Sequence, residues 1–145
     1  MKARGNYEPQ PFEIEVTGKN ALLKFYENVT EINEVDGEND SAFVGWEFDR
    51  YNIERPYDAS LSARVQGGLP AWLEMAKSEE RGRLAADVRS RRDALLKATD
   101  ITQLADAPLD KNTKAAYKEY RQALRDVPQQ EGFPYSVDFP VAPES

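Results

Sequence analysis

The fold of this chain is decided by residues 12–26, where apolar side chains recur with a period of two. The stretch reads Phe12-Glu13-Ile14-Glu15-Val16-Thr17-Gly18-Lys19-Asn20-Ala21-Leu22-Leu23-Lys24-Phe25-Tyr26. The alternation up to Thr17 is typical of a strand with one buried face. Gly18-Lys19-Asn20 has the composition of a tight turn, and a second apolar run follows it. The sequence therefore predicts two antiparallel strands near the start of the chain.

The same pattern continues to about residue 56. Apolar residues recur over 29–35, and residues 36–40 have the composition of a turn in which Asp36-Gly37 is a hairpin signal. Residues 42–53 are rich in aromatics, but their apolar phase breaks near Arg50, which predicts a bulge or a strand end there. We expect a small antiparallel β-meander of three or four strands over residues 1–56.

Helical signals begin after Pro56. Asp58 is suited to cap a short helix that runs to about Val65, and Gly67-Gly68 is suited to a turn. Pro70 then fits the first turn of a new helix, where its missing donor costs nothing. From there to about residue 98 the pattern indicates one long helix, or two helices that meet near Gly82.

A helical hairpin is predicted beyond residue 98. In the connection we expect Ile101, Leu104, Ala107-Pro108 and Leu109 to turn inward, and Asp110 is expected to cap a helix over about residues 111–126. The apolar face of that helix is predicted to hold Ala116, Tyr117, Tyr120, Ala123, Leu124 and Val127. Two helices joined by a structured loop form an antiparallel hairpin.

The proline-rich residues 128–145 are predicted to be extended, because proline and the residue before it disfavour helix. Two interpretations remain open. The segment is a strap that packs on the hairpin through Phe133 and Phe139, or it is an extended recognition arm for a partner. The predicted fold class is thus α+β, with a β-sheet region at 1–56 and a helical region at 57–145 that ends in an extended tail.

Composition excludes several kinds of chemistry. The chain has 145 residues, a net charge of −7, and neither cysteine nor histidine. Disulfides, Cys/His metal sites and Ser-His-Asp triads are therefore excluded. The acidic balance argues against non-specific binding to nucleic acid. No apolar run reaches the length of a membrane span or a signal peptide, so we expect a cytoplasmic protein without a membrane partner.

Two groups of side chains admit a structural and a functional interpretation. Arg83, Arg89, Arg91 and Arg92 lie in a basic stretch that is typical of a solvated helix face, or alternatively of an interface. The aromatic residues Trp46, Phe48, Tyr51 and Trp72 are more typical of core packing than of a ligand pocket.

The segment from about residue 92 to 140 resembles the phage tail assembly chaperone family of tailed bacteriophages and prophages. The resemblance lies in these blocks, in this order: Arg92-Asp93-Ala94-Leu95-Leu96, Thr99-Asp100, Gln103-Leu104-Ala105-Asp106-Ala107-Pro108-Leu109, Ala116-Tyr117, Tyr120-Arg121-Gln122-Ala123-Leu124-Arg125-Asp126, Pro128, Gly132-Phe133-Pro134, Val137 and Phe139-Pro140. Ile101 and Phe139 depart from the family, which often has tryptophan at these positions.

The resemblance implies a non-enzymatic assembly chaperone, without cofactor or metal, that binds a phage tail or tail-fibre protein in the host cytoplasm. It brings no catalytic residues. A small structural virion or baseplate component, or a prophage accessory protein that binds a host protein, are the alternatives. The sequence leaves the oligomeric state unknown. Tyrosine and arginine are enriched at interface hot spots, and we expect partner contacts from Tyr117, Tyr120, Arg121, Leu124, Arg125, Phe133, Tyr135 and Phe139.

Overall fold

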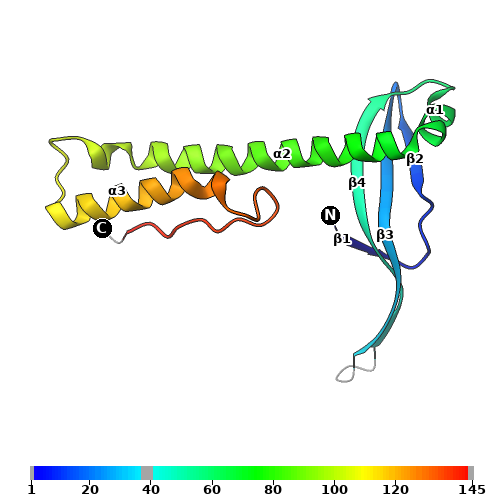
Figure 1. Cartoon of the computed structure of the whole chain (residues 1–145), viewed down its shortest axis with the longest axis horizontal. Coiled ribbons are helices and arrows are strands. Elements are labelled where there is room, and N and C mark those ends of the chain that lie inside the picture. Colours follow the sequence, from blue (N-terminus) through cyan, green and yellow to red (C-terminus); the bar gives the residue numbers. More distant parts are fainter. Residues whose placement is uncertain (1, 37–40, 144–145) are drawn as a thin grey trace. The chain divides into compact units, whose positions relative to one another are not determined.

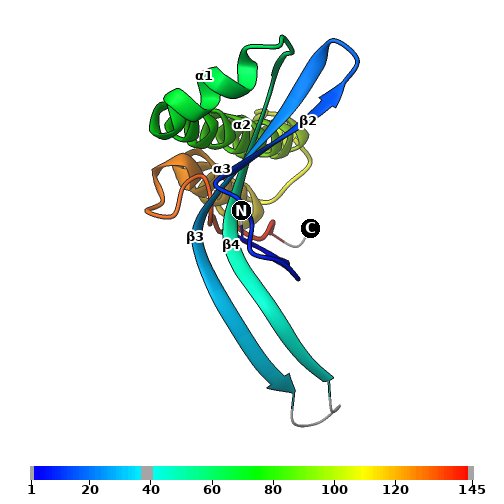
Figure 2. The ribbon, with the colours of Figure 1, turned by 90° about the vertical axis from the view of Figure 1, so that its right-hand side faces the viewer.

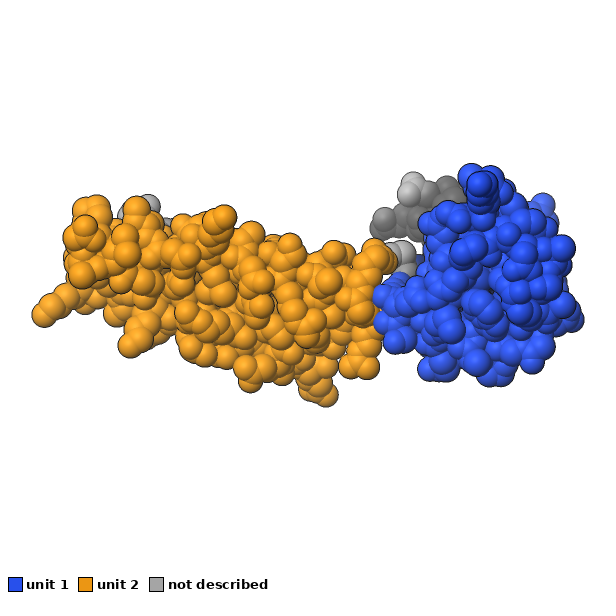
Figure 3. Space-filling model, turned by 90° about the horizontal axis from the view of Figure 1, so that it is seen from above, with its two compact units in different colours: residues 1–80 blue, residues 81–145 orange. Residues whose placement is uncertain are grey.

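The chain forms two compact units, residues 1–80 and 81–145, in a computed structural model that describes residues 2–36 and 41–143 (Figure 3). An antiparallel sheet lies in the first unit and helices occur in both, which confirms the predicted α+β class. The boundary falls inside a helix, because the start of that helix packs on the sheet. The predicted division at residue 56 follows secondary structure instead of packing, and it stays a prediction.

The first unit is built on four strands in the order β1-β4-β3-β2, with all neighbours antiparallel (Figure 1). The strands are β1 (Lys2–Gly5), β2 (Phe12–Thr17), β3 (Asn20–Asp36) and β4 (Ser41–Pro56). The last three form the predicted meander. The turn between β2 and β3 uses Gly18, whose φ of +62° lies in the left-handed region that favours glycine. Strand β1 was not predicted, because its four residues show no apolar alternation.

Strand β3 is one continuous strand of 17 residues, where the sequence suggested two shorter runs. Its register against β4 shifts between Glu27 and Thr30, so that two residues of β3 lie opposite Phe48. Asn28, at the shift, has a φ of +52°. A bulge therefore occurs close to Arg50, as predicted, but its extra residue lies in β3, and the alternative of a strand end is wrong because β4 runs through Arg50.

The change of apolar phase in β4 arises because different faces of the strand are covered on either side of Arg50. Ile53 faces the helices and is 3% exposed. Phe48 lies on the opposite face, where its ring meets Tyr26 edge-on at 5.2 Å between centroids and approaches Gly5. Apolar residues of β4 thus alternate as predicted, and the alternation is interrupted where the buried face of the strand changes from one side of the sheet to the other.

Two helices cover one face of the sheet. Helix α1 spans Leu61–Gly67 and helix α2 spans Leu69–Ala98, with Gly68 between them (Figure 2). Pro70 lies in the first turn of α2, as predicted. The buried core formed between the helices and the sheet contains Ala21, Leu23, Phe25, Ile53, Leu61, Val65 and Ala76. Tyr51 and Trp72 pack against this core, in agreement with the structural interpretation of the aromatic residues.

Ion pairs border this core. Lys77 Nζ lies 2.8 Å from a Glu27 carboxylate oxygen, and Arg55 pairs with Glu79. The hydrogen bond to Glu27, followed by the one to Glu74, raises the pKa of Lys77 above its ordinary value. Because these side chains are partly exposed, we expect each pair to contribute less than the buried apolar contacts.

The predicted cap of α1 is wrong in its position. Ser60 is the N-cap residue, and its side chain makes no capping hydrogen bond. Asp58 lies two residues earlier, where its carboxylate accepts from the Ser60 backbone N–H at 2.8 Å and pairs with Arg64. Asp58 therefore organises the loop before the helix instead of the first helical turn.

Helix α2 is one uninterrupted helix of 30 residues that runs through Gly82. Its part from residue 81 onward belongs to the second unit, together with everything that follows it in the chain. The short 3₁₀ helix η1 spans Asp100–Gln103, α3 spans Lys111–Asp126, and the 3₁₀ helix η2 spans Val127–Gln129. Helix α3 runs back beside α2 as the predicted antiparallel hairpin (Figures 1 and 2).

The connection between α2 and α3 differs from the prediction. Ile101 and Leu104 are exposed, with exposed fractions of 64% and 54%, and so is Pro108. Ala107 is buried as predicted, Leu109 is half-buried, and Thr102 is buried without having been predicted. The Thr102 hydroxyl donates to the Thr99 carbonyl at 2.6 Å. This hydrogen bond lets the short helix turn its polar side inward, which leaves two apolar side chains at the surface.

The turn predicted over residues 36–40 is described only at Asp36, the last residue of β3. Residues 37–40 lie outside the described residues.

Candidate partner-binding surface

Asp110 starts helix α3, as predicted. Its carboxylate accepts hydrogen bonds from the backbone N–H groups of Asn112 and Thr113 at 2.7 and 3.1 Å, and from the Thr113 hydroxyl at 2.6 Å. The Thr113 side chain, followed by the backbone donors, lowers the pKa of Asp110 below its ordinary value. The cap fixes where α3 begins and therefore which side chains its faces carry.

Arg121 is the polar anchor between the two helices of the hairpin. Its guanidinium donates to the Leu96 carbonyl at 2.5 Å, to the Thr99 hydroxyl at 2.8 Å and to the Asp100 carboxylate at 2.7 Å. The residue is buried, at 8% exposure. One side chain of α3 thereby satisfies acceptors at the carboxyl end of α2, where the last helical carbonyls have no partner within the helix.

Apolar side chains on either side of Arg121 form the core of the hairpin. Leu124 and Val127 are fully buried and Tyr120 is 6% exposed. The Tyr120 ring also meets Tyr117 edge-on, at 6.4 Å between centroids. Ala123, which was predicted to lie on the apolar face, is exposed, because the helical spacing places Arg121 on this face in its stead.

The segment after η2 forms a strap, which we define as residues 130–143. Gln130 closes its loop: the side-chain amide donates to the Asp138 carbonyl, and the side-chain carbonyl accepts from the Asp138 N–H, both at 2.8 Å. Inside the loop the Ser136 N–H donates to the Gly132 carbonyl at 2.8 Å. A Cβ atom at Gly132 would stand 2.2 Å from the Ser136 carbonyl oxygen, so this turn requires glycine.

Two arginines of α2 hold the strap. The Arg89 guanidinium carbon lies 5.0 Å from the centroid of the Phe133 ring, and that of Arg91 lies 4.2 Å from the Phe139 centroid. Farther along, the Tyr117 hydroxyl donates to the Pro143 carbonyl at 3.4 Å. These cation–π contacts give the basic stretch of α2 an intramolecular use that its sequence did not reveal. The strap interpretation of the tail therefore describes its packing.

The structure divides the eight predicted contact residues by exposure. Tyr120, Arg121 and Leu124 are buried in the hairpin. Tyr117, Phe133 and Phe139 are half-buried, and Arg125 and Tyr135 are exposed. Partner contact stays a prediction for the whole set. A partner can reach the exposed and half-buried members without opening the hairpin, whereas the three buried ones hold the surface in place.

Sequence reasoning missed several residues of this surface. Gln130 and Gly132 act through the local backbone, and although Gly132 belongs to a block of the resemblance, neither residue was predicted to have a role. Ile101 and Leu104 were expected inside. Arg121 was among the predicted contact residues, but its burial was not predicted, although it lies on the same helical face as Tyr117 and Leu124 by spacing.

A comparison with protein-family models identifies the family that the second unit resembles. Residues 85–144 match the family model described as phage tail assembly chaperone protein. The predicted resemblance is confirmed for this segment. It contains the second part of α2, α3 and the strap, all within the second unit. No curated protein and no solved structure matched the chain.

Two further observations concern the described residues, 2–36 and 41–143. We find among them no group of three or more acidic, histidine or cysteine residues placed to hold a metal ion. They also contain no helix with the length and apolarity of a membrane span.

Proposed function

We propose that this chain assists phage tail assembly as a non-enzymatic chaperone that binds a tail or tail-fibre protein through its second unit. The observation that carries the proposal is the match of residues 85–144 to the phage tail assembly chaperone protein family, which supports a role in tail assembly. The place of action is the host cytoplasm, where tails are assembled.

The proposed contact surface lies on the outward sides of α3 and the strap. Tyr135 is 60% exposed and Arg125 is exposed, and both are residue types that dominate binding energies at interfaces. Phe133 and Phe139 show one ring face to an arginine and remain half-buried. This surface presents aromatic and basic side chains, which suit an acidic or aromatic stretch on the client.

The test is capture of a client from cells that express this chain together with the phage tail genes. The double variant Tyr135→Ala/Arg125→Ala is expected to reduce the amount of captured tail protein about tenfold or more. The matched control is Tyr7→Ala/Arg81→Ala, which removes an exposed tyrosine and an exposed arginine elsewhere. Its capture is expected to equal that of the unchanged chain.

Three results would contradict the proposal in distinct ways. Incorporation of the chain into purified particles would make it a structural component. Capture of a host protein alone would make it a prophage accessory protein. Equal capture of the tail protein by both double variants would keep the assembly role and reject the proposed surface.

A further inference from the structure

The outer edge of β3 is open along much of its length. Strand β2 pairs with β3 only between Asn20 and Phe25, and the Tyr26 N–H then donates to the Pro11 carbonyl. Beyond this point β3 pairs with β4 alone, while β1 lies on the far edge of β4 as far as Trp46; from Ile32 and Gly45 onward β3 and β4 continue as a two-stranded ribbon (Figures 1 and 2). Within the described residues no strand pairs with the outer edge of β3 from residue 27 to 36. An open edge offers unpaired N–H and C=O groups to another extended chain.

The sequence of this part of the chain is strongly acidic. Residues 25–49 contain no lysine or arginine. Their acidic residues are Glu27, Glu31, Glu34, Asp36, Glu38, Asp40, Glu47 and Asp49. A segment with charge of one sign creates a field that attracts cationic groups and repels a segment like itself.

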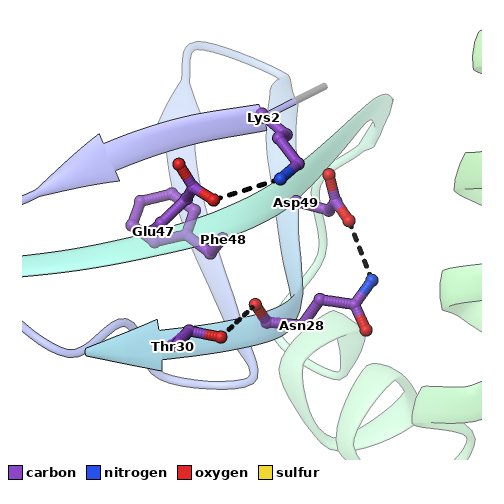
Figure 4. A pocket seen from close by; sticks show the side chains of 6 residues that line it. All are labelled: Lys2, Asn28, Thr30, Glu47, Phe48 and Asp49. Atoms are coloured by element: carbon purple, nitrogen blue, oxygen red, sulfur yellow. Dashed lines mark hydrogen bonds and ion pairs between the residues drawn. The ribbon is translucent and has the colours of Figure 1, made fainter. Parts of the chain in front are cut away.

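The acids at the base of the ribbon are already paired. Glu27 binds Lys77, and Glu47 lies 3.1 Å from Lys2 and 3.4 Å from Arg4. Asp49 accepts from the Asn28 amide at 2.8 Å, in a pocket of about 290 Å³ beside the bulge (Figure 4). The base is therefore internally satisfied, and beyond it the exposed Glu31 is the carboxylate that the described side chains offer to a partner.

The distal part also shows apolar side chains to solvent. Val44 of β4 is 59% exposed, and Ile32 of β3 is half-buried. Glu31 of β3 is exposed and pairs in register with Trp46 of β4. Acidic and apolar residues thus occur together on the ribbon, which fits a partner strand that carries both basic and apolar residues.

We propose that the outer edge of β3, residues 27–36, binds an extended basic segment of a partner protein, which adds to the sheet as a further strand. Backbone hydrogen bonds supply the pairing, and the carboxylates select lysine and arginine. A second copy of this ribbon is disfavoured as the occupant, because two acidic ribbons would repel each other. The inference concerns the first unit and does not depend on the family match, which covers residues 85–144 only.

The test uses a synthetic peptide matched in length to residues 28–36, capped at both ends, in which lysine alternates with valine and threonine. We expect it to bind the full chain and to shift the backbone amide NMR signals of residues 27–36 selectively. Raising NaCl from about 0.05 to 0.5 M should weaken binding about tenfold or more, because the interacting charges are exposed. The same peptide with alternate backbone nitrogens methylated should not bind, since it cannot complete the ladder.

A matched pair of variants locates the site. Glu31→Lys is expected to weaken peptide binding about tenfold, because it places like charges side by side. Glu119→Lys makes the same charge change at an exposed position of α3 and should leave binding unchanged. Circular dichroism of both variants checks that they are folded.

The proposal is overturned if the peptide fails to bind at millimolar concentration, if Glu31→Lys and Glu119→Lys bind it equally, or if the methylated peptide binds as well. Dimers of the chain joined through residues 27–36 would overturn it in favour of a second copy. None of these outcomes affects the capture test of the second unit, so the two proposals fail separately.

Discussion

The two units of this molecule obtain their order by different means. The first unit buries one apolar cluster between a sheet and two helices, and the side chains of that cluster follow the periods of their elements. The second unit has a smaller apolar core around Leu124 and adds polar anchors that bind backbone groups: Arg121, Gln130 and Asp110. Apolar contacts persist when side chains shift slightly, whereas a hydrogen bond to a particular carbonyl requires one distance and direction. We therefore expect the stability of the first unit to depend mainly on the volume of its buried side chains. The stability of the second unit should depend more on the geometry of its hydrogen bonds.

The largest effects are expected from the two cores. Phe25→Ala and Leu124→Ala remove fully buried side chains, and we expect losses of about 3–5 and about 2–5 kcal/mol of unfolding free energy. Both tryptophans, Trp46 and Trp72, belong to the first unit, so tryptophan fluorescence in a urea titration reports on that unit alone. Circular dichroism at 222 nm reports on the helices of both.

If Leu124→Ala shifts the fluorescence transition as much as Phe25→Ala does, the two units unfold as one, and the distinction between them is wrong. Val141→Ala is the control, since Val141 is 91% exposed and its truncation should stay within about 0.5 kcal/mol of the unchanged chain.

Arg121→Lys tests whether direction or charge matters at the hairpin anchor. Lysine keeps the charge but cannot reach the Leu96 carbonyl, the Thr99 hydroxyl and the Asp100 carboxylate with one planar fork. We expect a loss of about 1–3 kcal/mol in the helical transition and none in the fluorescence transition. Full stability of the lysine variant would show that charge alone is sufficient there.

Gly132→Ala and Gly82→Ala form a matched pair with opposite expected signs. A Cβ at Gly132 collides with the Ser136 carbonyl oxygen, so the strap loop must open, at about 1–3 kcal/mol. A Cβ at Gly82 meets nothing within 4 Å inside α2, where alanine should stabilise by about 0.5–1 kcal/mol. Hydrogen exchange of residues 133–141 should increase only in the first variant. Equal exchange in both would mean that the loop does not hold the strap.

The smallest expected effect is the loss of stability at low pH. The pKa values of Asp58 and Asp110 are both depressed, by Arg64 and the Ser60 hydroxyl in the first unit and by Thr113 in the second. Since the folded pKa lies below the unfolded one, the stabilisation is present above the ordinary value of 3.8 and is lost as pH falls through the depressed value.

Asp110→Asn keeps a capping side chain but removes the titration. Asp58→Asn likewise removes the titration in the first unit and keeps a side-chain acceptor for the Ser60 N–H. We expect each to flatten the fall in stability between about pH 4 and pH 2 in its own unit. The measurement is urea unfolding at a series of pH values, by circular dichroism and fluorescence together. An unchanged slope in the asparagine variants would assign the acid sensitivity to other carboxylates.

The elements that sequence could predict are those in which period and burial coincide. The alternation over Phe12–Thr17, the first turn at Pro70 and the cap at Asp110 each follow from local rules, and the structure confirms them. The apolar break near Arg50 was visible, but its cause was not. A single strand cannot reveal that its two halves are covered from opposite sides.

The parts that could not be predicted depend on partners distant in sequence. Strand β1 exists only because Glu47 and its neighbours offer an edge, and Arg89 faces a ring 44 positions later in the chain, Phe133. The inward turn of Thr102, which exposes Ile101, depends on a hydrogen bond that composition does not encode. In the candidate surface, the resemblance located the segment, and only the structure separated its buried residues from its exposed ones.

The strap has a consequence for the order in which the protein is made. Its anchors on α2, Arg89 and Arg91, leave the ribosome well before Phe133 and Phe139 do. At about 5–20 residues per second, synthesis of residues 81–145 takes roughly 3–13 s. The first unit, whose strands pair mostly with their neighbours in sequence, has time to fold in that interval. A nascent chain therefore passes through a stage in which the first unit is folded while the basic face of α2 is still uncovered, and the strap, which is translated later, covers it.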